Sequence, residues 1–400
     1  MEDKDSAQNQ AFEWLLEDPF VYEYPGWRIL QRHALMTIFY STAGIRWLNN
    51  TGWGSYNVHE CDWYQKPEFG FKSSIIEVYP GLQSSFLQHL REMHCDAQGF
   101  VHHLWMDQNN LVGSLPEELF SMTSLESISA GFNHLYGTIP SHIGQLSELK
   151  GFAAFSTELA GSIPKAIGSL TTLQAFVLYD NKLEGFIPDE LWQLSNLAFL
   201  MIGCNEKLQG TLPSIVGTLP KLRVFEMEKC GISGAIPPEL GQIESLQFLA
   251  LLGNQLSGTL PSELGSLSKL VHLHLHSNLL QGNLPSELSS LTNLEFLALG
   301  DNRFTGEIPS EFGLFPSLGL LNVKNNSLSG TIPDELSFLQ ETLFTLHTGG
   351  NALLSGAVPE SLCTLYGTPP CSGSGFGICP GILGTSFGCT DLLCGCDCPC

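Results

Sequence analysis

The feature that most constrains this chain is a Gly-x-(Ile/Leu/Val)-Pro motif that returns eleven times. Eight of the ten intervals between its prolines are 24 residues long, and the other two are 25 and 26 residues. A fixed period of this length is typical of proteins that stack one small unit, because no single unit can bury its apolar face alone. The chain is therefore predicted to form a solenoid of about eleven repeats. Its prolines are Pro116, Pro140, Pro164, Pro188, Pro213, Pro237, Pro261, Pro285, Pro309, Pro333 and Pro359.

One repeat, residues 246–261, shows how the unit is expected to fold. Leu249 and Leu251 alternate with residues that face outward, which is the period-two pattern of a half-buried strand. Gly258 permits a backbone conformation that other residues avoid, and Pro261 ends the second extended segment. The pattern predicts one short parallel strand per repeat over a continuous leucine core.

A column of polar residues follows the strand in every repeat. An asparagine there can hydrogen-bond backbone groups of the neighbouring turns, so stacked copies satisfy buried backbone polar groups. Thr157 and Cys230 stand in this column in place of asparagine. Its other members are Asn109, Asn133, Asn181, Asn205, Asn254, Asn278, Asn302, Asn326 and Asn351. We predict a structural ladder from these residues.

The repeat unit LxxLxLxxNxLxGxIPxxLGxL resembles the plant-type leucine-rich repeat. The match covers residues 101–359. The resemblance implies a right-handed, curved α/β solenoid without catalytic activity. It also implies recognition of a ligand, as in the ectodomains of receptor-like kinases and receptor-like proteins, or inhibition of enzymes that degrade cell walls.

The segment before the repeats resembles the helical N-terminal cap of the same family. The residues that carry this likeness are Tyr40, Thr42, Gly44, Trp47, Trp53, Cys61, Trp63 and Tyr64. In the family a second cysteine follows the first closely, whereas here Cys95 comes after an insertion, residues 65–94. Short helices are expected within residues 12–16 and 34–40. Together with the cysteine-rich end, the segment 10–16 is also similar to repeat proteins of diatom-like algae.

Four regions are predicted from these features. Residues 1–30 form an N-terminal extension, residues 31–100 form the cap with its insertion, and residues 101–359 form the solenoid. Residues 360–400 form a C-terminal cap that is rich in glycine and proline and holds eight of the twelve cysteines. Such cysteine density favours a module held by disulfides, whose pairing the sequence does not define.

Composition limits the partners. The chain has 17 basic and 40 acidic residues, a net charge of −23, which disfavours nucleic acid and anionic membranes. No apolar run reaches the roughly 18–20 residues of a membrane span, and the acidic start lacks a signal-peptide core. These two features favour the cytosol, but the cysteines favour an oxidising compartment. We expect the chain outside the cytosol, with any membrane anchor outside this chain. Asn49 and Asn325 open glycosylation sequons.

The candidate ligand contacts are side chains that flank the inward leucines and point out of the concave face. Apolar side chains gather on repeats 3 to 9, and two interpretations stay open: a binding surface, or rings that pack on one another. The predicted contacts are Phe155, Tyr179, Asp180, Phe199, Met201, Glu226, Glu228, Phe248, Leu252, His272, His274, His276 and Phe296.

Two groups within this set could carry other chemistry. His272, His274 and His276 alternate on one strand, so a metal site, a pH-sensitive contact and a solvated polar filler are all conceivable. Their spacing of roughly 6.6–7 Å along a strand is long for a compact metal site, and we expect no metal and no cofactor. Glu226 and Glu228 face the groove together, which favours recognition of a basic side chain over acid–base catalysis.

The leading hypothesis is an extracellular, non-catalytic recognition module that binds a protein, peptide or glycan on its concave face. One alternative is a structural or adhesive cell-wall protein that is cross-linked through its cysteines. Another is a secreted inhibitor of a hydrolase. The sequence does not define the ligand or the oligomeric state.

Overall fold

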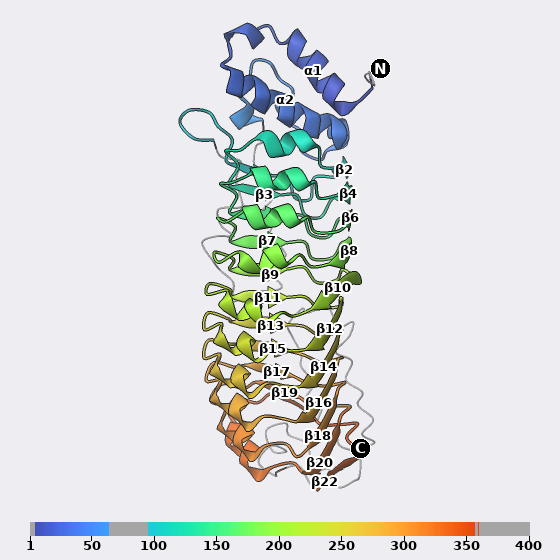
Figure 1. Ribbon diagram of the computed structural model, residues 1–400, viewed down its shortest axis with the longest axis vertical. Coiled ribbons are helices and arrows are strands. Elements are labelled where there is room, and N and C mark those ends of the chain that lie inside the picture. Colours follow the sequence, from blue (N-terminus) through green and yellow to red (C-terminus); the bar gives the residue numbers. More distant parts are fainter. Residues whose placement is uncertain (1–4, 64–94, 357–358, 360–400) are drawn as a thin grey trace. The chain divides into compact units, whose positions relative to one another are not determined.

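The computed structural model describes residues 5–63, 95–356 and 359, and it divides into two compact units, residues 1–208 and 209–400. The predicted insertion 65–94 and the predicted cysteine-rich cap 360–400 lie outside the described residues. Both units contain the repeat, and each repeat carries two short strands (Figure 1). The leucine-rich-repeat solenoid predicted from the sequence is confirmed.

The first unit begins with two helices, α1 (Ala7–Glu17) and α2 (Gly26–Ser41), which pack against each other (Figure 1). They confirm the two helices expected from the sequence, and both are longer than expected. Three short 3-10 helices lie around them: η1 (Val21–Glu23), η2 (Gly44–Arg46) and η3 (Glu60–Asp62).

A buried ion network ties these elements together. Arg32 on α2 contacts Asp18 at 3.2 Å and Glu60 at 3.0 Å, and the three side chains are fully buried. Arg28 adds a second contact to Glu60 at 3.0 Å, so two cations balance the two buried carboxylates. Because α2 runs across residue 30 and Asp18 belongs to this network, the predicted boundary between extension and cap does not separate two structures.

The first strand of each repeat pairs in parallel and in register with the next within its unit. Its central residue is buried, as predicted, in Leu104, Leu249 and Leu273 for example. The strands of the first unit are β1 (His103–Trp105), β3 (Ser127–Ser129), β5 (Gly151–Ala153), β7 (Ala175–Val177) and β9 (Phe199–Met201). Those of the second are β11 (Val224–Glu226), β13 (Phe248–Ala250), β15 (His272–His274), β17 (Phe296–Ala298), β19 (Leu320–Asn322) and β21 (Thr345–His347).

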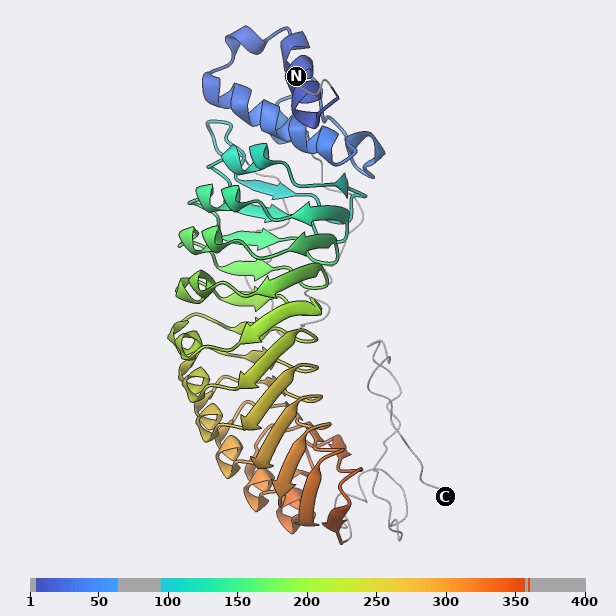
Figure 2. The same cartoon turned by 45° about the vertical axis from the view of Figure 1, so that its right-hand side comes forward.

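The second extended segment of each repeat forms a strand that pairs with its neighbours, whereas only one strand per repeat was expected. Its glycine has a positive φ, +78° at Gly258 for example, which a side chain would strain. Figure 2 shows these strands side by side in the second unit, in yellow to orange. They are β2 (Val112–Gly113), β4 (His134–Thr138), β6 (Glu158–Gly161), β8 (Lys182–Phe186), β10 (Lys207–Thr211), β12 (Gly231–Ala235), β14 (Gln255–Thr259), β16 (Leu279–Asn283), β18 (Arg303–Gly306), β20 (Ser327–Thr331) and β22 (Leu353–Ser355).

A short 3-10 helix follows the motif proline in ten repeats of the described chain and turns the backbone toward the next repeat. Each begins directly after the proline, whose fixed φ suits the start of a helix. These helices are η4 (Glu117–Ser121), η5 (Ser141–Gln145), η6 (Lys165–Ser169), η7 (Asp189–Gln193), η8 (Ser214–Thr218), η9 (Pro238–Gln242), η10 (Ser262–Ser266), η11 (Ser286–Ser290), η12 (Ser310–Leu314) and η13 (Asp334–Leu339).

The asparagine ladder forms as predicted. The amide of Asn254 donates to the carbonyls of Met227 at 2.7 Å and Leu251 at 3.0 Å. Its oxygen accepts from the backbone N–H groups of Cys230 and Ile232, both at 3.2 Å. One buried side chain therefore satisfies four backbone groups of adjacent turns, which makes the stacking of repeats specific. Cys230 and Thr157 are buried in the same column.

Candidate functional site

The first strands of the repeats form one sheet, which we call the first sheet. In each strand, the side chains on either side of the buried central residue point outward from this sheet. We call this surface the front face; it is the surface that the sequence analysis placed on the concave side. Its outward columns begin at His103, Trp105 and Asp107 in the first unit. In the second unit they begin at Val224 and Glu226 on β11 and at Glu228 just after it. All predicted ligand contacts except Asp180 belong to these columns.

In the first unit, apolar side chains close the front face. Phe155, Phe199 and Met201 expose only 5%, 4% and 3% of their surface. The ring of Phe155 lies over Gly131, where an added Cβ would come within 2.5 Å of the ring. Phe132 packs against Phe155 edge to face, with ring centroids 5.0 Å apart. Of the two interpretations left open for the apolar side chains, these three fit the second, because they are packed into the face and do not present a binding surface.

Two other predicted contacts of the first unit remain accessible. Tyr179 is half-buried, and Asp180 is exposed at the turn that follows β7, where its φ is +56°. They can take part in a contact at the surface, whereas Phe155, Phe199 and Met201 cannot do so without repacking.

Asp107 is a polar group of the first unit that was not singled out from the sequence. Its carboxylate accepts hydrogen bonds from the Ser129 hydroxyl at 2.8 Å and the Gly131 backbone N–H at 2.6 Å. Burial raises the pKa of Asp107 to about 6, although these two hydrogen bonds favour the charged form. The available sequence signal was an acidic residue aligned with a glycine, Gly131, one repeat away.

In the second unit, aromatic and imidazole rings stand side by side on β13, β15 and β17. His272 and Phe296 are stacked at 4.5 Å between centroids with only 8° between their planes. Phe248 lies 5.2 Å from His272 on the other side, and 5.6 Å from His274. All four rings are half-buried. We call Phe248, His272, His274 and Phe296 the ring platform.

Burial keeps the imidazoles of the platform neutral. It lowers the pKa of His272 to about 4 and that of His274 to about 3. For His274, the neighbouring histidines on both sides also oppose a positive charge. Burial likewise lowers the pKa of His276, while Asp301 partly restores it. A titration near neutral pH, considered from the sequence, is therefore not supported, because these rings lack the solvation that a charged imidazole needs.

Sequence reasoning missed Phe344, which extends the platform. This ring is 43% exposed, yet it reaches Phe296 with centroids 6.1 Å apart in an edge-to-face arrangement. The reach is possible because Gly319 has no side chain: a Cβ there would lie 2.2 Å from the Phe344 ring. A glycine in one repeat opposite a phenylalanine in the next was the available signal, and the same pairing holds for Gly131 and Phe155.

The remaining predicted contacts of the second unit differ in exposure. Glu226 is fully buried, whereas Glu228 and Leu252 are half-buried. The backbone N–H of Glu228 donates to the Glu226 carboxylate at 3.4 Å. Glu228 therefore remains a candidate for contact with a basic group, but the expectation that Glu226 is exposed is wrong.

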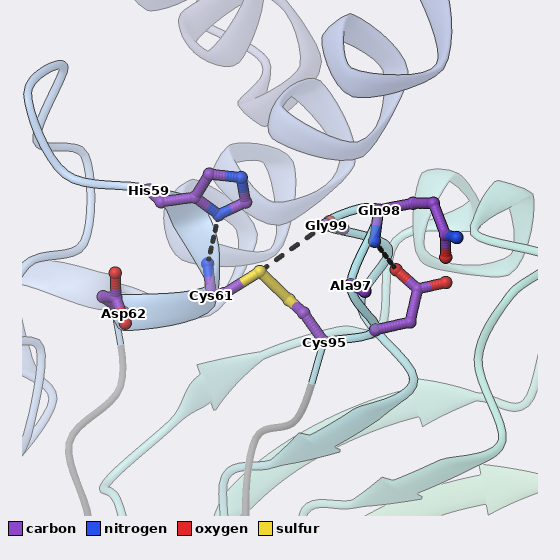
Figure 3. Close-up of a pocket in the computed structure, with 8 residues that line it drawn as sticks. His59, Cys61, Asp62, Cys95, Ala97, Gln98 and Gly99 are labelled. Carbon is purple, nitrogen blue, oxygen red and sulfur yellow. Dashed lines mark hydrogen bonds between the residues drawn. A yellow bond between two sulfur atoms is a disulfide. The ribbon is translucent and has the colours of Figure 1, made fainter.

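The cap holds a cavity that is separate from the front face (Figure 3). Cys61 and Cys95 are bonded to each other in its wall, although the insertion separates them in the sequence. His59 accepts a hydrogen bond from the Cys61 backbone N–H at 3.2 Å. Within residues 5–63, 95–356 and 359, no group of three or more His, Cys, Asp or Glu side chains is arranged to hold a metal ion.

The two sequons differ in their surroundings. Asn325 is exposed, and its amide donates to Asp301 at 2.7 Å. Asn49 is half-buried and is bonded through both its backbone groups to the Asn109 side chain, at 2.6 and 3.0 Å. In the part of the chain that the structure describes, no helix has the length and hydropathy of a membrane span.

Comparisons with known proteins agree with this architecture. The family model described as Leucine Rich Repeat matches residues 245–267, 269–291, 293–315 and 317–339. A comparison with curated protein sequences finds no match. Among solved structures, a leucine-rich-repeat protein of Leptospira interrogans is 31% identical; the match covers 65% of this chain and 69% of that protein, with a TM-score of 0.51.

Plant receptor ectodomains are also similar. The ectodomain of the membrane receptor kinase GASSHO1/SCHENGEN3 from Arabidopsis thaliana, in complex with CASPARIAN STRIP INTEGRITY FACTOR 2, is 33% identical with a TM-score of 0.65. The match covers 68% of this chain and 32% of that one. The plant peptide hormone receptor RGFR1 in complex with RGF2 is 31% identical over 68% of this chain and 50% of the receptor, with a TM-score of 0.59. The chain thus spans between a third and a half of these ectodomains.

Proposed function

Because this chain belongs to the leucine-rich-repeat proteins of the plant type, we propose that it is a non-catalytic recognition module that binds a peptide or protein ligand on its front face. The similar plant ectodomains were solved with a peptide hormone or an integrity factor bound, which supports this class of ligand. The ring platform is the contact surface in this proposal, and Glu228 and Asp180 favour a ligand with basic residues.

The single observation that carries the proposal is the half-burial of the ring platform. Large apolar side chains in a regular repeat are expected to be buried, as Phe155 and Phe199 are in the first unit. Phe248 and Phe296 instead leave part of their rings in solvent, next to two neutral imidazoles. Clustered exposed aromatic area of this kind marks interaction sites, because covering it releases water and few side-chain rotamers are lost.

The proposal places the module outside the cytosol. The Cys61–Cys95 disulfide supports an oxidising compartment, and the exposed Asn325 offers a glycan acceptor. Enzymatic release of glycans from protein secreted by eukaryotic cells would test this part, followed by mass spectrometry of the peptide that contains Asn325. We expect an occupied Asn325; a bare Asn325 and free Cys61 and Cys95 thiols in protein from its natural source would contradict it.

Selection from a random peptide library displayed on phage tests the binding function. The full chain is immobilised, and enriched peptides are then measured against the double variant Phe248→Ala/Phe296→Ala. We expect binding to weaken by about a hundredfold, because two half-buried aromatic anchors are removed.

Phe338→Ala is the matched control, since Phe338 is also a phenylalanine of the second unit but lies on η13 and is 69% exposed. It should bind every enriched peptide as tightly as the natural chain. If the selection enriches no peptide, or if all enriched peptides bind the double variant unchanged, the front face of the second unit is not the binding surface.

A further inference from the structure

Helix α1 of the first unit carries apolar residues on two of its sides. Its inner side holds Ala11, Trp14 and Leu15, which are buried in the cap. Phe12 and Leu16 lie on another side of the helix and expose 49% and 54% of their surface. A surface helix normally has one apolar stripe that faces the core and a polar remainder. The second apolar stripe of α1 is therefore unusual, and it is open to solvent.

The rotation of α1 about its own axis is fixed by Trp14. The Trp14 indole N–H donates to the Gly54 carbonyl at 3.1 Å, and its ring is stacked on the Tyr56 ring with centroids 5.1 Å apart. The Tyr56 hydroxyl donates to the Trp14 carbonyl at 3.1 Å. Helix α2 packs against α1 and also against η4 of the first repeat (Figure 1). Because these contacts hold the inner side in place, α1 cannot turn to bury Phe12 and Leu16.

The exposed side of α1 presents two rows of side chains. Phe12 and Leu16 are four residues apart, so they are neighbours on the helix surface. Glu13 and Glu17 have the same spacing and form a second row beside the first. Both carboxylates are exposed, and in the described part of the chain neither forms an ion pair; Glu17 accepts a hydrogen bond from the Tyr56 hydroxyl at 3.5 Å. An apolar row thus lies next to a row of uncompensated negative charge.

Another exposed phenylalanine of the first unit lacks this combination. Phe186 on β8 is 70% exposed, and Glu184 lies on the same side of that strand. Lys207 of the next repeat comes within 3.9 Å of the Glu184 carboxylate. The carboxylate beside Phe186 therefore has a cation next to it, whereas the described part of the chain places none beside Phe12 and Leu16.

The two rows define the kind of surface that complements them. We propose that the exposed side of α1 docks a basic amphipathic helix of a partner protein. The apolar residues of that helix cover Phe12 and Leu16, and its lysine or arginine side chains meet Glu13 and Glu17. A helix matches both rows, because its own side chains recur at the same spacing of three to four residues. This surface belongs to the cap, so the inference goes beyond ligand binding on the front face.

A second copy of this chain is a poorer occupant of the same surface. Its own α1 brings two further carboxylates to the contact, and like charges placed together oppose association. The whole chain has a net charge of −23, which repels another copy and an anionic membrane alike. The same field attracts a basic partner, in the same sense as the local charges of Glu13 and Glu17.

Fluorescence anisotropy with a designed peptide tests the proposal without knowledge of the natural partner. The probe is a labelled helical peptide with leucine on one side and lysine on the other, titrated into the full chain at physiological ionic strength, which screens distant charges. A second peptide has glutamate in place of every lysine. We expect the leucine–lysine peptide to bind saturably, and Phe12→Gln/Leu16→Gln to weaken it about tenfold. Glutamine suits a helix, and circular dichroism checks that the variant is folded.

Matched variants distinguish the site from general attraction. Phe186→Gln also removes an exposed phenylalanine of the first unit and should leave binding unchanged. Glu13→Gln/Glu17→Gln should weaken binding about fivefold and reduce its dependence on salt. The proposal is overturned if the leucine–lysine peptide does not bind, if it binds all variants equally, or if the leucine–glutamate peptide binds as well. Dimerisation of the free chain that Phe12→Gln/Leu16→Gln abolishes would assign the surface to a second copy and overturn it too.

Discussion

The front faces of the two units carry similar aromatic rings that differ in their exposure to solvent. In the first unit Phe155 and Phe199 are 5% and 4% exposed, whereas in the second Phe248 and Phe296 remain half-buried. Phe155 lies down over Gly131, because that glycine leaves the space. Phe248 and Phe296 instead pack against His272 on the intervening strand, at 5.2 and 4.5 Å between ring centroids.

The difference shows that a ring's own column does not decide whether it is available to a ligand. The neighbouring repeat contributes as well, because strands of the first sheet pair in register and place His272 next to Phe296. Phe155 packs over Gly131 and is buried, whereas Phe344 lies over Gly319 and is still 43% exposed, so a glycine one repeat away makes room for a ring but does not by itself bury it.

The largest expected effect comes from truncating one ring in each unit. Phe155→Ala should lower the free energy of unfolding by about 3–5 kcal/mol, because it empties a buried site. Phe248→Ala should cost only about 1 kcal/mol, since that ring is partly in water already. Thermal and urea unfolding of the two variants would show it; equal losses would mean that the two faces are packed alike.

Replacing Gly131 and Gly319 by alanine should give a smaller difference in stability between the two units. Gly131→Ala and Gly319→Ala both place a Cβ in a phenylalanine ring, at 2.5 Å from Phe155 and 2.2 Å from Phe344. Phe155 is buried and has no free space, so we expect a loss of about 1–3 kcal/mol. Phe344 is 43% exposed and can swing into solvent, so Gly319→Ala should lower the melting temperature less. The reverse order would refute the role of the neighbour.

Acid should destabilise the second unit through its histidines. Burial lowers the folded-state pKa of His272 to about 4, below the usual 6.5. Between these values the unfolded chain binds more protons, so the stabilisation is complete above pH 6.5 and is lost as the pH falls toward 4. His272→Gln should reduce this loss by on the order of 1–2 kcal/mol in melting curves from pH 7 to 4. His134→Gln, on exposed β4, should leave the curve unchanged.

Asp107 should give the opposite and smallest pH effect in the first unit. Burial raises its pKa from 3.8 to about 6, so the folded chain binds more protons between these values and stability falls as the pH rises through them. Asp107→Asn should remove about 1 kcal/mol of this dependence, since its hydrogen bonds to Ser129 and Gly131 offset part of the desolvation. Asp180→Asn, which changes an exposed carboxylate, should leave the pH dependence of stability unchanged. If the two variants show the same pH dependence, Asp107 is solvated.

The sequence predicted what recurs in every repeat and missed what depends on one pair of neighbours. The 24-residue period identified the core leucines and the asparagine ladder, because these residues recur at the same positions in each repeat. The second extended segment was expected but its pairing into a sheet was not, because its outward residues vary from repeat to repeat. The burial of Phe155 and the reach of Phe344 could not be seen in single columns, because each follows from a glycine one repeat before it.

Hydroxyl-radical footprinting with mass spectrometry tests the central claim most directly, because it measures the exposure of each side chain in the intact protein. The account predicts rapid oxidation of Phe248, His272 and Phe296, slow oxidation of Phe155, Phe199 and Met201, and protection of the first three when an enriched peptide is added. Rapid oxidation of Met201 together with a protected Phe248 in the free protein would contradict it, since the open surface would then lie on the other unit.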